Sequence, residues 1–382
     1  MKNFFFFLAL FSTLYATPSM RPVTYEAIQK ANKLLDTKQY QEAKELFDEL
    51  IASTSKNRRY DHAFIQNAYG YLWIQKEDYT QAIGSYEKAL AYKVLPKAMQ
   101  DSITLTLAQL FLQQSAFQKT IDLVTKWHSS KKPSALSAKL LMIAYISLED
   151  KTTGLYWCQK AVNLSQNPSL PLFQTKVSLE LQLLKYPQAI QSLLYMLDHF
   201  KPKLIYFKQL AFLFAHEDKT SKGIALLESA FQMGLMEKKE DLLQLAQLLH
   251  QEGAPIKAVH IVQKLQDEYP DDEKLSNYLA ILHLESKEFT QALKTLHGLY
   301  QQTKKPLTAL KLAQLYAQKE HWKDSLFYAK KTKKAPQGIL LQAISLTQLG
   351  KITSAINLFK KAKESPKTRT QAQMWLQHLT LN

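Results

Sequence analysis

The stretch LAQLLHQEGAPIKAVHIVQKLQDEYP, from Leu245 to Pro270, places Ala246, Ala258 and Pro270 twelve residues apart, with apolar residues between them. Twelve residues match neither a single strand nor a single helix. They fit two helices joined by a short turn if a small residue marks the point where each helix crosses the other, because antiparallel helices pack most tightly where side chains are smallest. Such a unit should recur along the chain.

The unit recurs ten times. Around each copy, Leu, Ile, Phe and Tyr return at spacings of three and four residues, which gives each helix an apolar stripe. A small or short residue opens the second helix of each copy, and the intervals between these residues run from 30 to 39 and cluster near 34. The residues are Ala43, Ala82, Thr120, Gly154, Ala189, Gly223, Ala258, Ala292, Ser325 and Ala355.

The pattern resembles the tetratricopeptide repeat, a helical hairpin with a period of about 34 residues. The resemblance covers residues 24–366 and implies an all-α fold, a right-handed α-solenoid of about ten hairpins. We expect residues 367–382 to form a C-terminal capping helix, because the apolar face of the last repeat in a solenoid must be covered. Met142 and Val177 are larger than the residues at the equivalent first crossing elsewhere, so the register of repeats four and five stays open.

The N-terminus reads MKNFFFFLALFSTLYATPSM, in which Lys2 precedes an apolar run from Phe4 to Leu14. This order is typical of a secretory signal peptide, and the run is short for a membrane span. We expect a signal peptide over residues 1–16, cleaved after Ala16, and then a short N-terminal lead over residues 17–23. The chain would then be periplasmic. An uncleaved signal that anchors it in the inner membrane is the alternative.

The net charge of +16 is distributed unevenly. Residues 302–382 hold 15 Lys or Arg and 3 Asp or Glu, whereas residues 237–288 hold 11 acids and 6 bases. A basic surface favours a polyanionic partner. For an exported chain, an anionic membrane surface or an acidic protein segment fits better than nucleic acid, and a solvated helical face is the alternative. The predicted basic patch comprises Lys330, Lys331, Lys333, Lys334, Lys360, Lys361 and Lys363.

The sequence contains no motif that carries catalytic or cofactor chemistry. The ten histidines form no HExxH pair, and the chain has neither a GxxxxGKS/T loop nor GxGxxG. Cys158 is the only cysteine, so it cannot form an internal disulfide, and we expect it to be a small buried hydrophobic residue. We therefore predict that the chain is not an enzyme and has no catalytic, cofactor-binding or metal site.

A stack of hairpins presents an extended concave surface, which the first helix of each pair lines in tetratricopeptide folds. Amides and an aromatic side chain on that surface suit an extended peptide or a partner helix, although exposed polar residues without a partner are the alternative at each position. The Lys–Asn pair with which chaperone-binding members hold a terminal carboxylate is absent from repeat one, where Ile28 precedes Asn32. The candidate groove residues are Asn67, Tyr71, Gln75, Gln109, Gln113, Lys139, Lys208, Phe212 and Gln247.

Three segments carry a closer resemblance: Tyr25–Ile51, Gly234–Val262 and Ser365–Leu379. They are similar to a bacterial periplasmic tetratricopeptide family described as an accessory of TonB–ExbB–ExbD energy-transducing systems. The resemblance implies a non-catalytic scaffold that mediates protein–protein interactions, with TonB, ExbB or ExbD as partners and uptake of iron complexes as the process. A general envelope-assembly scaffold, for cell wall, secretion or motility, is the alternative.

Overall fold

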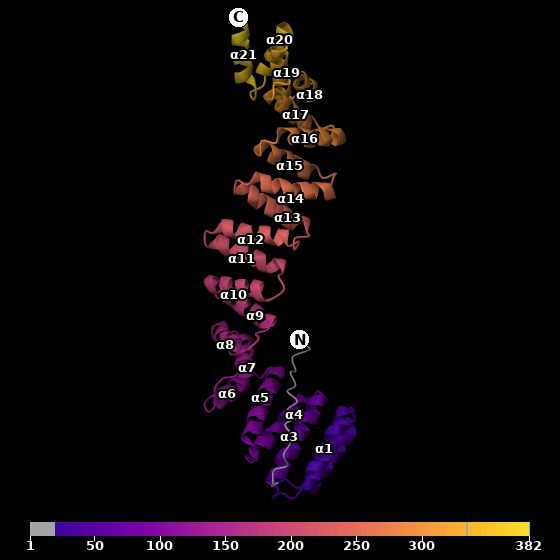
Figure 1. Cartoon of the computed structure of the whole chain (residues 1–382), viewed down its shortest axis with the longest axis vertical. Helices are drawn as coiled ribbons and strands as arrows, with labels where there is room; N and C mark the ends of the chain where they lie inside the picture. The colour runs from indigo at the N-terminus through magenta and orange to yellow at the C-terminus, as the bar shows by residue number, and fades with distance from the viewer. Residues whose placement is uncertain (1–19, 334, 382) are drawn as a thin grey trace. The chain divides into compact units, whose positions relative to one another are not determined.

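The computed structural model describes residues 20–333 and 335–381, and the regular structure in these residues is α-helical throughout. Twenty-one helices follow one another in pairs along this part of the chain (Figure 1). The described residues divide into two compact units, one that ends at Phe200 and one that begins at Lys201. The predicted signal peptide and its cleavage site lie outside the described residues.

The first unit contains five hairpins. In each, a first helix packs on a second helix, and within the unit the second helices of the first four hairpins also pack on the first helix of the next hairpin. The helices are α1 (Pro22–Asp36), α2 (Tyr40–Ser53), α3 (Arg59–Gln75), α4 (Tyr79–Ala91), α5 (Lys97–Gln113), α6 (Phe117–His128), α7 (Ala135–Ser147), α8 (Lys151–Leu164), α9 (Leu170–Gln182) and α10 (Tyr186–His199).

The second unit contains five more hairpins, packed in the same way, and a final helix that packs on the last hairpin. This succession of hairpins confirms the predicted all-α fold class. The helices are α11 (Leu204–His216), α12 (Thr220–Gln232), α13 (Lys239–Gln251), α14 (Pro255–Glu268), α15 (Glu273–Glu285), α16 (Phe289–Thr303), α17 (Pro306–Gln318), α18 (Trp322–Ala329), α19 (Pro336–Gln348), α20 (Ile352–Lys363) and α21 (Arg369–Leu381).

In all ten hairpins the same turn connects the first helix to the second. The middle residue of this turn has left-handed backbone geometry. In the first hairpin this residue is Lys38, with φ 62°, and its N–H donates to the carbonyl of Leu35 at 3.0 Å. The N–H of Gln39 donates to the carbonyl of Leu34 at 2.8 Å. This is the Schellman arrangement, which satisfies the last carbonyls of a helix. The equivalent turn residues are Glu77, Ser115, Glu149, Leu184, Asp218, Gly253, Lys287, Glu320 and Gly350.

Each of these turn residues lies five positions before one of the ten small residues identified from the sequence. Because the turn geometry is the same every time, it fixes the register of every hairpin. Glu149 precedes Gly154 in repeat four, and Leu184 precedes Ala189 in repeat five. The two repeats whose register the sequence left open therefore follow the common pattern.

The small residues lie where the two helices of a hairpin cross, as the spacing of twelve predicts. The hydroxyl of Ser325 donates to the carbonyl of Ala313, twelve residues earlier, at 2.9 Å. A Cβ added to Gly223 would lie 2.8 Å from the carbonyl oxygen of Ala211, again twelve residues earlier. The sequence predicted that these residues open the second helix, and this was wrong. They lie one turn inside it, as Ala258 does in α14.

The last hairpin is covered by α21, whose Trp375 stacks on Phe359 of α20 with ring centroids 5.8 Å apart. Phe359 and Ala372 are fully buried at this contact. The end of the second unit is thus closed by apolar packing, which a terminal repeat requires. None of the helices in the described part of the chain is long and apolar enough to cross a membrane.

Candidate binding groove

The nine predicted groove residues all lie on first helices, and they share three positions within the repeat. The first helix also has a residue at the crossing, twelve positions before that of the second helix, as Ala246 stands before Ala258. Relative to this residue, the nine candidates lie three positions before it, one position after it or five positions after it. These positions are four residues apart, so they lie on one helix face. By helix, the residues are Asn67, Tyr71 and Gln75 on α3, Gln109 and Gln113 on α5, Lys139 on α7, Lys208 and Phe212 on α11, and Gln247 on α13.

These residues differ in their exposure and in their contacts within the chain. Phe212 has 64% of its surface exposed, and Gln113 and Gln247 are also exposed. Tyr71 is half-buried and bonds to the Gln75 side chain, and burial, with a smaller effect of Asp36, raises its pKa. The shared position therefore sets the direction in which a side chain points, and the neighbours decide whether it is free.

Lys208 is already engaged within the chain. Its Nζ lies 2.5 Å from Oδ1 of Asp241, on the first helix of the next repeat. The following repeats continue this pattern, since Lys239 pairs with Asp272 at 2.6 Å. The Nζ of Lys311 donates to Oδ1 of Asn277 at 2.8 Å. In this part of the second unit, polar side chains on first helices tie consecutive hairpins together.

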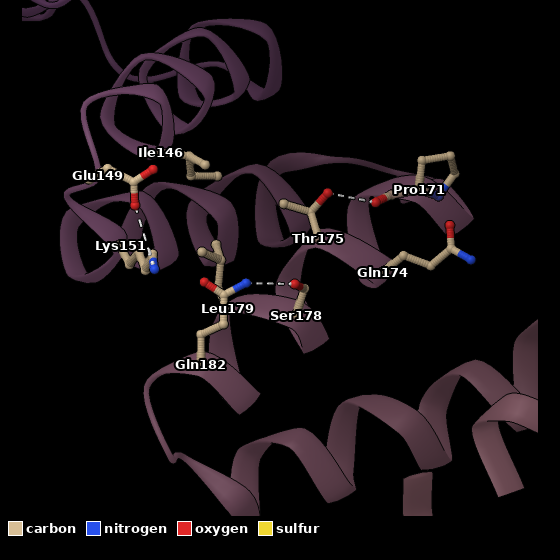
Figure 2. A pocket seen from close by; sticks show the side chains of 9 residues that line it. All are labelled: Ile146, Glu149, Lys151, Pro171, Gln174, Thr175, Ser178, Leu179 and Gln182. Atoms are coloured by element: carbon tan, nitrogen blue, oxygen red, sulfur yellow. Dashed lines mark hydrogen bonds and ion pairs between the residues drawn. The ribbon is translucent and has the colours of Figure 1, made fainter. Parts of the chain in front are cut away.

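A hollow lies beside α9 in the first unit, where the sequence placed no candidate. It is an open groove of about 610 Å³ between the α7–α8 turn and the outward face of α9 (Figure 2). This volume falls within the range of about 300–1,000 Å³ that is usual for ligand sites. The lining residues are Ile146, Glu149, Lys151, Pro171, Gln174, Thr175, Ser178, Leu179 and Gln182.

Three residues of this groove occupy the repeat positions on which the prediction relied. Gln174, Ser178 and Gln182 stand three before, one after and five after Val177. They were missed because Val177, like Met142 in the preceding repeat, is larger than the alanine or glycine at the other first crossings, which left the register of this repeat open. The spacing of twelve from Val177 to Ala189 was the signal that identifies them.

The groove combines hydrogen-bonding groups with apolar walls and carries little net charge. Gln182 Nε2 donates to Ser178 Oγ at 3.1 Å, as Figure 2 shows. At the rim, Lys151 Nζ lies 3.5 Å from Oε2 of Glu149, so the two charges offset each other. Ile146 supplies an apolar wall. Amide and hydroxyl groups beside apolar surface suit an uncharged extended peptide, whose backbone needs hydrogen-bond partners.

The opposite face of α9 is unusual because it buries charge. Lys176 Nζ lies 2.8 Å from Oε1 of Glu180 and donates to Oγ of Ser192 in α10 at 2.5 Å. The other carboxylate oxygen of Glu180 is buried and has no hydrogen-bond partner among the described residues. Burial raises the pKa of the nearby Cys158 thiol to about 12, so the thiol is uncharged. Cys158 is thus a buried free cysteine, as predicted.

The basic patch lies at the ends of second helices, away from the first-helix row. Lys330, Lys331 and Lys333 follow α18, and the other described members belong to the last turn of α20. Lys334 lies outside the described residues. No cluster of three or more His, Cys, Asp or Glu side chains with metal-binding geometry occurs in the part of the chain that the structure describes.

No protein-family model and no curated protein matches the sequence. Among solved structures, the chain is similar to a tetratricopeptide repeat protein from Parabacteroides merdae, at 14% identity, with 84% of this chain and 99% of that chain covered and a TM-score of 0.32. It is also similar to YrrB, described as a tetratricopeptide repeat protein with an unusual peptide-binding site, at 14% identity, with 54% and 97% covered and a TM-score of 0.39. A third, described as MamA MSR-1 C2, shows 17% identity, 42% and 95% coverage and a TM-score of 0.34. These similarities are too distant to locate a binding site in this chain.

Proposed function

We propose that this chain is a non-catalytic scaffold that binds an extended segment of a partner protein in the groove beside α9. The observation that carries the proposal is the groove itself, in which Gln174, Ser178 and Gln182 face a hollow of about 610 Å³. An extended peptide brings unpaired backbone N–H and C=O groups, and these amides and hydroxyls can satisfy them.

The finer proposal concerns location and partner. We propose that the chain is exported to the periplasm and associates with a TonB-type energy-transducing system for outer-membrane uptake. The apolar run from Phe4 to Leu14 supports export, and the three resembling segments in repeat one, in repeat seven and at the C-terminus support the TonB-type partner. A general envelope-assembly scaffold is the second candidate, because export and a helical-hairpin array suit it equally.

The partner is tested by crosslinking living cells, purifying the tagged chain and identifying the attached proteins. Recovery of TonB, ExbB or ExbD, together with impaired TonB-dependent uptake in a deletion strain, supports the finer proposal. Recovery of cell-wall, secretion or motility components with normal uptake transfers the chain to the second candidate. A reaction catalysed by the purified chain and abolished by a point substitution would overturn the non-catalytic assignment.

The groove is tested separately with a matched pair of variants. Ser178→Arg places a long charged side chain in the groove, whereas Gln191→Arg places the same side chain on the exposed surface of α10 in the same repeat. We expect Ser178→Arg to lose the crosslinked partner and Gln191→Arg to retain it. Equal recovery by both variants would contradict a role for the groove, whichever partner is attached.

A further inference from the structure

Repeats nine and ten carry the same lysine motif at the same place. KKTK (Lys330–Lys333) and KKAK (Lys360–Lys363) each begin five residues after the small residue of their second helix, which is Ser325 in repeat nine and Ala355 in repeat ten. The lysines therefore stand five, six and eight residues after the crossing in both repeats. In each of the other eight repeats these three positions hold at most one lysine.

Equivalent positions of consecutive hairpins in a stacked array lie along one edge, so we place the two motifs on a single surface, which we call the six-lysine edge. All six side chains are exposed, and none has an acidic partner within ion-pair distance among the described residues. The six-lysine edge consists of Lys330, Lys331, Lys333, Lys360, Lys361 and Lys363.

Acidic residues around this edge are few. Asp324 lies in the first turn of α18, at the opposite end of that helix from Lys330, and Glu320 lies in the turn before it. Glu364 is exposed directly after α20 and is the one carboxylate next to the edge in the sequence. Arg369 adds positive charge beside this edge, where its Nε donates to the carbonyl of Lys363 at 3.3 Å.

Helix stability alone does not account for this arrangement. A lysine in the last turn of a helix interacts favourably with the helix dipole, but this effect favours one or two positive charges and is opposed by repulsion among three within four residues. Earlier in the same unit, Lys239 and Lys257 each have an acidic partner from a neighbouring repeat. Six exposed lysines without acidic partners in the chain favour a negatively charged partner from outside it.

An exposed aromatic side chain stands beside the lysines. Phe327 has 55% of its surface exposed, and its ring lies 5.3 Å from Nζ of Lys331. An exposed aromatic ring among lysines is the combination with which peripheral proteins lie on membranes, the ring entering the headgroup region and the lysines remaining in water.

We propose that the six-lysine edge and Phe327 bind the surface of an anionic phospholipid bilayer. Lysine ammonium groups are point charges without the planar fork with which arginine grips a single carboxylate, so a row of lysines suits a diffuse negative surface better than one acidic side chain. The lysines stand at the ends of second helices and in the turns after them, and none of them lines the groove beside α9. This inference is therefore independent of the protein-binding function proposed above.

The test is co-sedimentation of the purified chain with vesicles. One set contains phosphatidylcholine alone, and the other contains phosphatidylcholine and phosphatidylglycerol in equal parts. The variant Lys360→Ala/Lys361→Ala/Lys363→Ala is compared with Lys56→Ala/Lys88→Ala/Lys132→Ala, which removes the same charge from exposed positions in the first unit. Each lysine near an anionic surface contributes about fivefold in affinity, so the edge variant is expected to bind on the order of a hundredfold more weakly.

The expected result is binding of the unsubstituted chain to the anionic vesicles only, kept by the control variant, lost by the edge variant and weakened by added salt. Phe327→Ala should weaken binding without any change of charge. Equal binding by the edge and control variants would overturn the proposal, because net charge alone would then explain the attraction. Binding to a polyglutamate peptide but not to the vesicles would overturn it in favour of an acidic protein segment.

Discussion

Repeat five and repeats six to eight use the two faces of their first helices in opposite ways. In repeat five, α9 turns an ion pair between Lys176 and Glu180 inward and leaves its outward row open to the groove. In repeats six to eight, the positions equivalent to Lys176 hold buried leucines, as at Leu245, and the ion pairs lie on the outside. There they tie neighbouring first helices together, as Lys208 and Asp241 do.

The difference shows that the repeat position determines where a side chain points but not what it does. Ser178 and Gln247 occupy the same position in their repeats, but Ser178 lines the groove beside α9 and Gln247 stands exposed on α13. Lys208 lies on the same helix face as the other predicted groove residues, but it is held by an acidic residue of the next repeat. A surface for partners therefore arises where the hairpins are held together by other means and the outward row lines a hollow, as it does in repeat five.

The largest loss of stability is expected at the close crossing of the two helices of a hairpin, on which repeat five and repeats six to eight both depend. Ala258 is fully buried at this crossing, so Ala258→Glu forces a larger side chain and an unpaired charge into it. We expect a loss of unfolding free energy on the order of 5 kcal/mol. Thermal unfolding measures it against His260→Glu, an exposed site in the same helix. Equal melting temperatures for the two variants would show that the repeat register is wrong.

The buried ion pair of repeat five is expected to have the next largest effect. Glu180→Ala leaves Lys176 buried without its carboxylate, which should lower the unfolding free energy by about 3–5 kcal/mol. The double variant Lys176→Leu/Glu180→Leu restores the apolar pattern of the other repeats and should be close to the unsubstituted chain or more stable. Chemical denaturation of the three proteins checks this, and a double variant less stable than Glu180→Ala would contradict it.

Asp272 should contribute less to the unfolding free energy than the buried ion pair does. It acts through a helix cap and an ion pair. Its Oδ1 accepts hydrogen bonds from the N–H groups of Lys274 and Leu275 at the start of α15, at 2.9 and 3.2 Å. Asp272→Ala should lower the unfolding free energy by about 1–2 kcal/mol at neutral pH.

The pH dependence of this effect has a definite sign. The side chain of Lys239 and the backbone N–H groups lower the pKa of Asp272 in the folded chain. Its stabilisation is therefore complete above the unfolded value of about 3.9 and disappears as the pH falls through the lower folded value. The melting temperatures of the unsubstituted chain and of Asp272→Ala, measured from neutral to acidic pH, should converge at the acidic end. A difference in melting temperature that grows on acidification would contradict this account.

The smallest effect is expected for the pair between Lys208 and Asp241. The lysine is more than one third exposed, so solvent screens the attraction, and Lys208→Ala should change the unfolding free energy by about 0.5 kcal/mol or less. A double-mutant cycle with Asp241→Ala measures the coupling. A coupling above about 2 kcal/mol would mean that the outward ion pairs, rather than apolar packing, hold these hairpins together.

The sequence predicted the hairpins well because their crossings depend on residues within one repeat. Ala246 and Ala258 are twelve residues apart, and their small size alone identifies the contact. The final helix was predictable for a similar reason, since the last hairpin ends on an apolar face that Trp375 covers.

The candidate binding surface was harder to predict from the sequence, because it depends on contacts between repeats. Asp241 lies 33 residues after Lys208, so their pairing appears only when the hairpins are stacked. The α9 groove was missed because Val177 stands where most repeats have alanine or glycine, which concealed the register of repeat five. The inward pair of Lys176 and Glu180 breaks the apolar stripe, and the sequence alone does not show that the two charges face each other.

The central claim is that the outward row of α9 contacts a partner protein, and site-specific photocrosslinking in living cells tests it most directly. A photoreactive amino acid is placed at Ser178, in the groove, or at Gln191, on the exposed surface of α10. We predict one discrete adduct from position 178 and none from position 191. No adduct from position 178, or the same adduct from both positions, would contradict the claim.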